Sequence, residues 1–344
     1  MALIRLNTRS LPDNAVTTAK VADNAVTTTK LFADNLGRRN VLINGNFDVW
    51  QRATSFTDVA GIWKYGHADR WNGHNDAADA GTYSQSTVVP NAGSTYSMLL
   101  TGASGVSNTN FSQRIESADL KGIRVKDSFT VSGYARSAIA GKVIACHALC
   151  PTALDNYAGY TQHNSLMTST TISGNGGTGT SSLTLTDANT WYYFTFTKTS
   201  ATSLTNFDKG YALFLAINGQ TSTSHQVYLS QLQVEAGTTA TPFEQRSFGE
   251  ELQLCQRYYM KETTTRSLYV YQDSNVYLRD NFYFPVEMRA NPTVAVGTIH
   301  ANAGSQSGST SLSGLSKKGV IVGVDTTAVN GRFQYANLSA EAEL

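Results

Sequence analysis

A ten-residue repeat near the start of the sequence constrains this chain most. The segment Asp13–Lys20, DNAVTTAK, returns ten positions later as DNAVTTTK at Asp23–Lys30. Units with so few apolar groups cannot alone offset the roughly 1 to 2 kcal/mol per residue lost when backbone is ordered. Their β-branched residues favour extended chain, and each Asp-Asn pair favours a turn. The repeat predicts a stem of several intertwined chains, with Val16, Val26 and Leu31 at the contacts. A disordered polar leader is the alternative, but it does not explain the regular spacing.

Composition indicates a folded protein with an uncharged surface chemistry. The 344 residues are 41% hydrophobic, enough for two compact domains, while charged residues make up only 15% against roughly 25% in ordinary domains. A net charge of +1 without a basic run argues against nucleic acid as a partner. The longest apolar stretches, such as Tyr211–Ile217, fall short of the roughly 20 residues that cross a bilayer, and the start lacks the apolar stretch of a signal peptide. We therefore expect that the protein does not insert into a membrane and that it is synthesised in the cytoplasm.

The three cysteines predict neither a disulfide framework nor a metal site. Cys146, Cys150 and Cys255 are odd in number, and their spacing matches no zinc motif. Cys146 lies in an alternating strand pattern, and a fourth ligand is not evident. We expect no cofactor.

Short alternating runs from Val41 onward, separated by Gly, Asn, Ser and Asp, predict an all-β protein with a β-sandwich. In the run Trp191–Lys198, Tyr192, Phe194 and Phe196 share one face, so one side of this strand should face a core. The clearest predicted strands are Phe129–Arg136, Lys142–Ala148, Trp191–Lys198, Tyr211–Ile217 and Gln226–Val234.

One helix is predicted near Ser247, because Ser247 and Glu250 form a capping-box pattern. Alternation then resumes and predicts a small C-terminal β-domain. Its expected strands are Ser267–Tyr271, Asn281–Val286, Gly319–Val324 and Arg332–Leu338. The expected organisation is a repeat stem in residues 1–39, a sandwich in 40–246, and the short helix with the C-terminal β-domain in 247–344.

The sequence offers little for catalysis, and we predict no catalytic residue. Cleavage of a glycoside would need two carboxyl groups roughly 5 to 10 Å apart. The densest acidic group is Asp69, Asp76 and Asp79, but pairing of Asp69 with Arg52 or Arg70 is at least as good an explanation for that residue. The six histidines are scattered without a metal-binding spacing.

Recognition of sugars by aromatic rings and polar groups is the better candidate chemistry. Two clusters fit it. The first is Tyr157 and Tyr160 with His163, in an expected loop, and the second is Tyr269, Tyr271 and Tyr277 in the C-terminal domain. Strand tyrosines more often lie in cores or subunit interfaces, which is the alternative for both clusters. Trp50, Trp71 and Trp191 are expected in the core.

Six segments stand out in a characteristic order and make up about a third of the chain: the repeats, Asn40–Arg52, Ala68–Trp71, Gln233–Glu244, Leu254–Tyr259 and Phe284–Thr293. Together they resemble segments of bacteriophage tail-fibre or receptor-binding proteins. Residues 41–234 also resemble jelly-roll carbohydrate-binding modules, whose opening strand carries Asn-Gly-x-Phe followed by an acidic residue, here Asp48.

The resemblance implies a homotrimer in the virion tail, attached to a tail or baseplate protein by its N-terminus and recognising a host-surface polysaccharide. It also makes Asp48 a weak calcium candidate, because in those modules the acidic residue shares the ion with an Asp of the last strand. The segment Tyr228–Gln233 supplies no such carboxylate, so we predict no metal. Two alternatives stay open: a structural tail or baseplate connector, and a surface-polysaccharide depolymerase.

Overall fold

The computed structural model describes residues 38–58, 63–75, 81–163, 169–173, 182–269, 276–297, 299–301, 310–326 and 332–344. The chain divides into two units, residues 1–39 and 40–344. The repeats lie outside the described residues, as do Val16, Val26 and Leu31, so the predicted stem and its contacts stay predictions.

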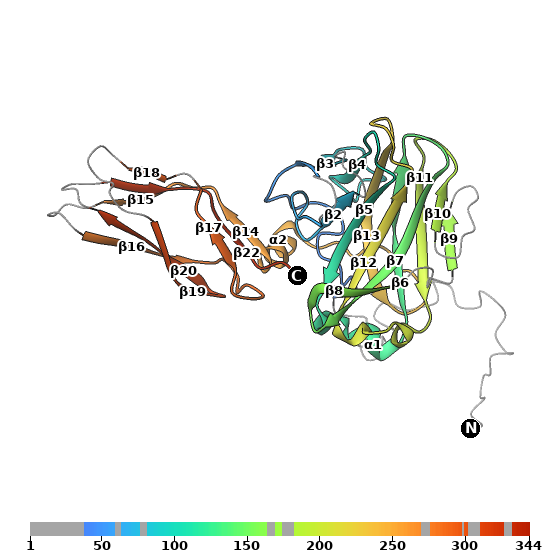
Figure 1. Cartoon of the computed structure of the whole chain (residues 1–344). Helices are drawn as coiled ribbons and strands as arrows, with labels where there is room; N and C mark the ends of the chain where they lie inside the picture. The colour runs from blue at the N-terminus through green and yellow to red at the C-terminus, as the bar shows by residue number, and fades with distance from the viewer. Residues whose placement is uncertain are drawn as a thin grey trace, which may run out of the picture. The chain divides into compact units, whose positions relative to one another are not determined.

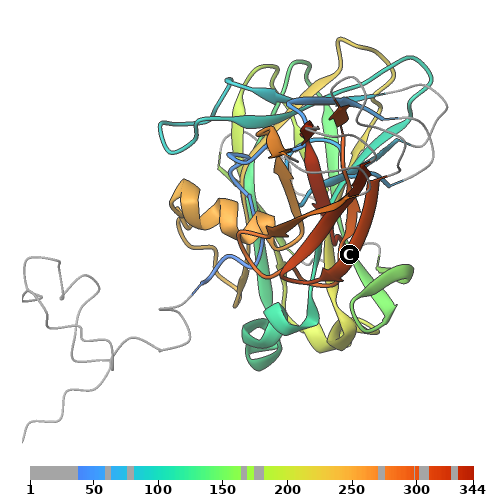
Figure 2. The same cartoon turned by 90° about the vertical axis from the view of Figure 1, so that its left-hand side faces the viewer.

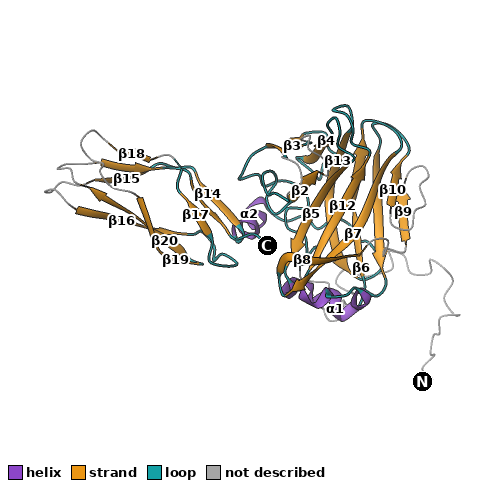
Figure 3. Cartoon of the chain, viewed as in Figure 1, coloured by secondary structure: helices purple, strands orange, loops and turns teal. Residues whose placement is uncertain are grey.

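Two antiparallel sheets form a jelly-roll sandwich, as the sequence predicts (Figures 1 and 3). Sheet A has the described order β1 (Ser55–Thr57), β3 (Thr82–Ser86), β4 (Ser97–Thr101), β13 (Gln226–Ala236), β6 (Phe129–Ser137), β11 (Trp191–Lys198) and β9 (Ser169–Ser173). Sheet B has the order β10 (Ser182–Leu185), β7 (Lys142–Ala153), β12 (Tyr211–Asn218), β5 (Asn108–Ile115) and β2 (Asn72–Asn75), and β8 (Asn156–His163) pairs with β7.

The sandwich core confirms the alternation predicted for Trp191–Lys198. Tyr192, Phe194 and Phe196 are buried between the sheets, whereas the alternate residues of β11 up to Thr197 face outward and are partly exposed. All five predicted sandwich strands form, and β11 has the predicted bounds. The centre of the core holds the rings of Trp71 and Phe111, stacked with their centroids 4.5 Å apart.

A histidine lies in this core and gives the fold a measurable pH dependence. His67 stacks on Tyr83 with 4.7 Å between ring centroids and also contacts Phe56 and Phe111. Burial lowers the pKa of His67 to about 3, whereas an unfolded histidine takes up its proton near pH 6.5. The unfolded state therefore binds more protons between these two values. The stability that His67 contributes is complete above pH 6.5 and is lost as the pH falls toward 3.

We expect the substitution His67→Leu to remove that slope. Between pH 7 and pH 5 the parent should lose about 2 kcal/mol more unfolding free energy than the variant. The reason is that most of this pH range lies between the pKa of His67 in the folded protein, about 3, and its pKa of about 6.5 in the unfolded chain. Urea unfolding at pH 5, 6 and 7 measures both slopes. Equal slopes would show that His67 is not buried in its neutral form.

The described residues contain two α-helices, of which the sequence predicts one. The α2 helix (Phe248–Gln256), orange in Figure 2, begins where the capping pattern predicts: the Ser247 hydroxyl accepts a hydrogen bond from the Glu250 amide at 3.3 Å. The α1 helix (Lys121–Lys126) was not predicted. It has only six residues and buries Ile123, too short a segment for a helical period to stand out. No helix of the described residues is long and apolar enough to span a membrane.

After α2 the described chain forms three small antiparallel sheets. They are β14 (Tyr259–Glu262), β22 (Leu338–Glu341) and β17 (Thr293–Ala295); β15 (Arg266–Tyr269), β21 (Arg332–Tyr335) and β18 (Ile299–Ala301); and β16 (Val276–Tyr283), β20 (Gly319–Thr326) and β19 (Thr310–Ser316). They share a core of their own around Phe282, Val322 and Leu338. The predicted strand Asn281–Val286 is wrong in its bounds. The strand in the structure, β16, begins earlier and ends at Tyr283, because the nearby Pro285 has no N–H group to donate to a neighbouring strand.

Buried ion pairs join this C-terminal part to the sandwich. Arg70 is 1% exposed; it pairs with Glu343 through Nη1, donates from Nη2 to the Arg114 carbonyl at 2.7 Å, and lies 3.4 Å above the Tyr258 ring. Arg52 also reaches Glu343, at 3.2 Å. Because breaking a buried ion pair strongly lowers stability, these contacts couple the stability of the two parts.

Candidate functional site

The outward face of sheet A presents aromatic side chains where a solvent-facing strand normally presents small polar ones. The pairing of β11 with β6, and of β6 with β13, sets outward-facing residues side by side in rows. We call two of these the open rows: Tyr193, Tyr134 and Ser230 form the first, and Trp191, Arg136 and Tyr228 form the second. The members on β11 and β6 are partly exposed, whereas Ser230 and Tyr228 on β13 are buried.

Two tyrosines are the centre of the first open row. Tyr134 and Tyr193 are direct cross-strand partners, and their ring centroids lie 5.1 Å apart with the planes inclined at 56°. Both rings are partly exposed. The Tyr193 hydroxyl hydrogen-bonds the Ser132 side chain, while burial raises the pKa of Tyr193, so the hydroxyl is protonated at neutral pH. The pair offers apolar ring surface held in place by the sheet.

The chain after β13 folds back over the neighbouring part of the same face. We call residues 237–245 the strap. Thr241 donates to the Glu235 carboxylate from both its amide and its hydroxyl, at 2.8 and 2.6 Å, and the Glu244 amide donates to Gln233 Oε1 at 2.9 Å. Glu235 and Gln233 are almost fully buried beneath it. The strap therefore covers Gln233 and Glu235, and several of its residues line the same pocket as Tyr134 and Tyr193.

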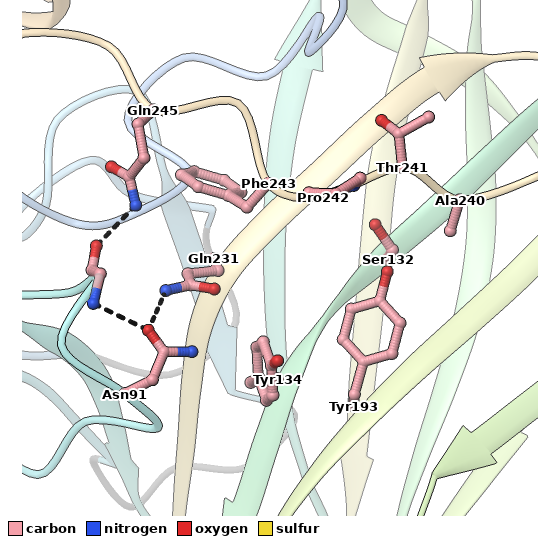
Figure 4. Close-up of a pocket in the computed structure, with 11 residues that line it drawn as sticks. Asn91, Ser132, Tyr134, Tyr193, Gln231, Ala240, Thr241, Pro242, Phe243 and Gln245 are labelled. Atoms are coloured by element: carbon pink, nitrogen blue, oxygen red, sulfur yellow. Dashed lines mark hydrogen bonds between the residues drawn. The ribbon is translucent and has the colours of Figure 1, made fainter. Parts of the chain in front are cut away.

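A β-bulge aims an amide into the space between the strap and the tyrosines. The register of β13 shifts between Ser230 and Gln233, and Gln231 within the shift has a φ of 52°. Bulges of this kind redirect side chains. Gln231 donates from Nε2 to Asn91 Oδ1 and to Ser94 Oγ, both at 2.9 Å. The Gln231 oxygen and the Asn91 nitrogen are turned toward Tyr134 (Figure 4).

Gly93 links the loop before β4 to the strap. Its amide donates to Asn91 Oδ1 at 2.8 Å, and its carbonyl accepts from Gln245 Nε2 at 2.6 Å. A Cβ at this position would lie only 2.9 Å from Asn91 Oδ1 and 3.1 Å from Gln245 Nε2. A larger residue here would push these two amide side chains away from the positions in which they close the edge of the site.

Together these elements enclose a pocket of about 570 Å³. Its lining is Asn91, Gly93, Ser132, Tyr134, Tyr193, Gln231, Ala240, Thr241, Pro242, Phe243 and Gln245 (Figure 4). None of these residues carries a charge. The pocket combines aromatic surface with amide and hydroxyl groups, which is suited to a neutral, hydroxyl-rich ligand. It contains no pair of carboxyl groups with which to cleave a glycosidic bond.

The structure separates the first predicted tyrosine cluster. Tyr157, Tyr160 and His163 belong to strand β8, where we expected a loop. Tyr157 is 5% exposed and donates its hydroxyl hydrogen to the Ile115 carbonyl at 3.0 Å, so its ring is not available to a sugar. Tyr160 is 40% exposed. The side chain of His163 lies outside the described residues.

The second predicted cluster is not brought together in the described residues either. Tyr269 is 52% exposed on β15, whereas Tyr277 belongs to β16 in another sheet. Tyr271 and the side chain of Tyr277 lie outside the described residues.

Asp48 lies beside a network of amides and hydroxyls. Its Oδ2 accepts from Asn46 Nδ2 at 3.0 Å, and burial raises the pKa of its carboxyl group. Asn46 in turn contacts the Gly93 carbonyl and the Ser94 hydroxyl. Within the described residues, no group of three or more His, Cys, Asp or Glu side chains lies close enough to hold a metal ion.

Asp69 makes the structural contacts that the sequence suggested. Its Oδ1 lies 3.3 Å from Arg52 Nη1, and its Oδ2 accepts from Gln51 Nε2 at 2.8 Å. Burial raises the pKa of this carboxyl group to about 7. Asp76 and Asp79 lie outside the described residues.

Two of the three tryptophans predicted to lie in the core do so. Trp71 is fully buried and Trp50 packs against the core, but Trp191 lies in the second open row and is partly exposed. The prediction of a buried Trp191 is therefore wrong, because Trp191 and Tyr193 alternate with the core residues of β11. Two large rings on the solvent-facing side of a strand were the signal that could have identified the open rows.

Comparison with known proteins gives remote structural likeness. No protein-family model matches the sequence, and no curated protein matches it. Among solved structures, the CBM22-1 xylan-binding domain from Paenibacillus barcinonensis is 10% identical, over 59% of this chain and 99% of that one, with a TM-score of 0.32. The family 11 carbohydrate-binding module of a cellulosomal cellulase from Clostridium thermocellum is 8% identical, over 54% and 100%, with a TM-score of 0.31.

The enzymatically active domain of tailspike protein 4 from bacteriophage CBA120 is 13% identical over 57% of this chain, with a TM-score of 0.29. The match spans 21% of the tailspike chain. At TM-scores this low, the likenesses decide neither a ligand nor an activity.

Proposed function

We propose that the sandwich is a non-catalytic glycan-binding module and that its site is the pocket with the two open rows of sheet A. The observation that carries this proposal is the Tyr134–Tyr193 pair, with centroids 5.1 Å apart beside a 570 Å³ pocket lined by uncharged polar groups. A pyranose ring has an apolar face that lies well on tyrosine, while its hydroxyls need donors and acceptors. Gln231 and Asn91 supply both kinds of group.

Binding rather than cleavage is supported by the composition of the pocket. Its lining has no carboxyl group, and the carboxyl group of Glu235, buried beneath the strap, is occupied by the Thr241 amide and hydroxyl. A glycosidase needs one carboxyl group as acid and a second as base or nucleophile. We therefore place this chain among adhesins rather than depolymerases.

The wider role we propose is that of a homotrimeric bacteriophage tail fibre, attached to the tail or baseplate by its N-terminal end. The support for it is the DNAVTT repeat and the segment order described above. Three copies of a weak sugar site on one fibre would act together, because the first contact raises the effective concentration of the others. Firm attachment to a host surface then needs no strong individual site.

A screen against purified bacterial surface polysaccharides tests the binding function. Full-length protein should retain at least one polysaccharide on a pull-down or biolayer assay, and that polysaccharide should release no new reducing ends on prolonged incubation. New reducing ends would favour a depolymerase. A folded protein that retains none of the polysaccharides would favour a structural connector.

The stem makes a separate prediction about assembly. The full chain should sediment at about three times the 37.1 kDa of one chain, because the repeats need other copies to become ordered. A protein starting at Asn40 should keep the β-sheet circular dichroism of the parent and sediment as a smaller species. A monomeric full-length chain would contradict the predicted stem and leave the glycan site unaffected.

A further inference from the structure

Arg136 is the charged residue of the open rows. It lies at the middle of the second row, between Trp191 on β11 and Tyr228 on β13. It is two residues along β6 from Tyr134, which corresponds to about 7 Å in a strand. A chain of sugars that places one ring on the tyrosine pair therefore has its next unit within reach of this guanidinium.

The guanidinium of Arg136 is held in place before any ligand arrives. Nε donates to the Asn189 carbonyl at 3.1 Å, and Nη2 donates to Asn189 Oδ1 at 2.7 Å. The Arg136 Cζ lies 4.8 Å from the centroid of the Tyr228 ring, whose edge meets Trp191 with 6.4 Å between centroids. Because Asn189 accepts from Nε and from one Nη2 hydrogen, the pair that remains for a ligand is Nη1–H and the second Nη2–H.

Arg136 also differs from the arginines that support the fold. Arg52, Arg70 and Arg246 each lie within 4 Å of a carboxylate, whereas no ion pair of the described residues includes Arg136. A fixed guanidinium on a surface with two aromatic rings around it is a receptor for a planar anion, since its paired N–H groups match the two oxygens of a carboxylate.

We propose that the ligand of this site is an acidic polysaccharide in which a carboxylated sugar is joined to a neutral one. The neutral sugar occupies the pocket against Tyr134 and Tyr193, and the carboxylate of its neighbour binds Arg136. This proposal rests on the proposed function and adds the class of glycan that the site selects.

The test compares acidic glycans with their own carboxyl-reduced forms. The probes are oligosaccharides of hyaluronan, unsulfated chondroitin and heparosan, in each of which a uronic acid alternates with a neutral N-acetylated sugar. Each is compared with the same material after its carboxyl groups have been reduced to hydroxymethyl groups, and dextran sulfate serves as a non-specific polyanion. Full-length protein should bind at least one acidic probe about tenfold more tightly than its reduced form, because a charge-assisted hydrogen-bonded pair at a partly exposed site has about that effect.

Three variants separate Arg136 from general charge. Arg136→Gln should bind the acidic probe no more tightly than the reduced one. Arg136→Lys keeps the charge but loses the paired N–H groups of the guanidinium, so it should retain only part of the preference for the acidic probe. Lys121→Gln, at an exposed position of α1, removes the same charge elsewhere and should change nothing. Circular dichroism confirms that each variant is folded.

Two patterns of binding would overturn the inference while leaving the proposed function in place. One is that the protein binds the acidic and the reduced glycans with equal affinity, and that replacing Tyr134 and Tyr193 abolishes the binding of both. The other is tighter binding to dextran sulfate than to every carboxylated probe, which would indicate a sulfate or phosphate ligand. No binding to any probe, by a folded chain that retains a neutral polysaccharide in the screen above, would contradict the inference alone. A folded chain that retains no polysaccharide in either experiment would contradict both the inference and the proposed function.

Discussion

Replacing Tyr134 and Tyr193 together with alanine should lower the affinity for the bound polysaccharide about 100-fold. Each ring offers apolar surface to a sugar, and losing one such contact costs about 1.5 kcal/mol; two losses give about 3 kcal/mol, or two decades in the dissociation constant. Isothermal titration calorimetry with an oligosaccharide of the bound polymer measures the change. Both side chains face outward, so the fold should tolerate their removal.

Two further variants make this prediction specific. Tyr193→Phe keeps the ring and loses only the hydrogen bond with Ser132, so its affinity should stay within about fivefold of the parent, the effect of one neutral hydrogen bond. Tyr160→Ala removes an exposed tyrosine from β8 and should leave the affinity unchanged. A loss of binding in Tyr160→Ala and not in the double variant would move the site to sheet B.

Replacing Arg70 with methionine should cost about 3 to 5 kcal/mol of unfolding free energy. The substitution leaves Glu343 buried with only part of its compensating charge and leaves the Arg114 carbonyl without its donor, and breaking a buried ion pair has an effect of this size. Urea unfolding followed by circular dichroism measures it. Lys121→Met, at an exposed position, is the matched control and should change stability by less than about 0.5 kcal/mol.

The double variant R70M/E343Q distinguishes the buried charge from lost packing. Removing the second charge should restore part of the stability, because no uncompensated carboxylate then remains in the interior. A single variant as stable as the control would show that Arg70 and Glu343 are solvated, and that the C-terminal part is not joined to the sandwich through them.

Local patterns predicted the strands of the sandwich well. In β11 every second residue is large and apolar, and that period alone identifies the strand and its buried face. The β16 strand was placed too late because Phe284 continues the aromatic run, and the effect of Pro285 on the ladder outweighed that pattern. The repeats in residues 1–39 lie outside the described residues, so the structure does not test them.

The candidate site could not be predicted in the same way, because its parts come from distant segments. Tyr134 and Tyr193 are neighbours only through the pairing of β6 with β11, and Gln231 enters the pocket only through a bulge. The strap joins them from residues 240–245. Tyr157 illustrates the reverse error: it was expected in a loop with Tyr160 and His163, but it belongs to β8 and its ring is buried. Local sequence shows which residues are aromatic and polar, and the sheet register decides which of them meet.

The structure of the full chain crystallised with an oligosaccharide of the bound polysaccharide is the most direct test of the glycan site. We predict a sugar ring lying on Tyr134 and Tyr193, with its hydroxyl groups hydrogen-bonded to Asn91 and Gln231. A sugar bound elsewhere, at Tyr160 on β8 or among the C-terminal sheets, with the sheet A pocket holding only water, would contradict the account.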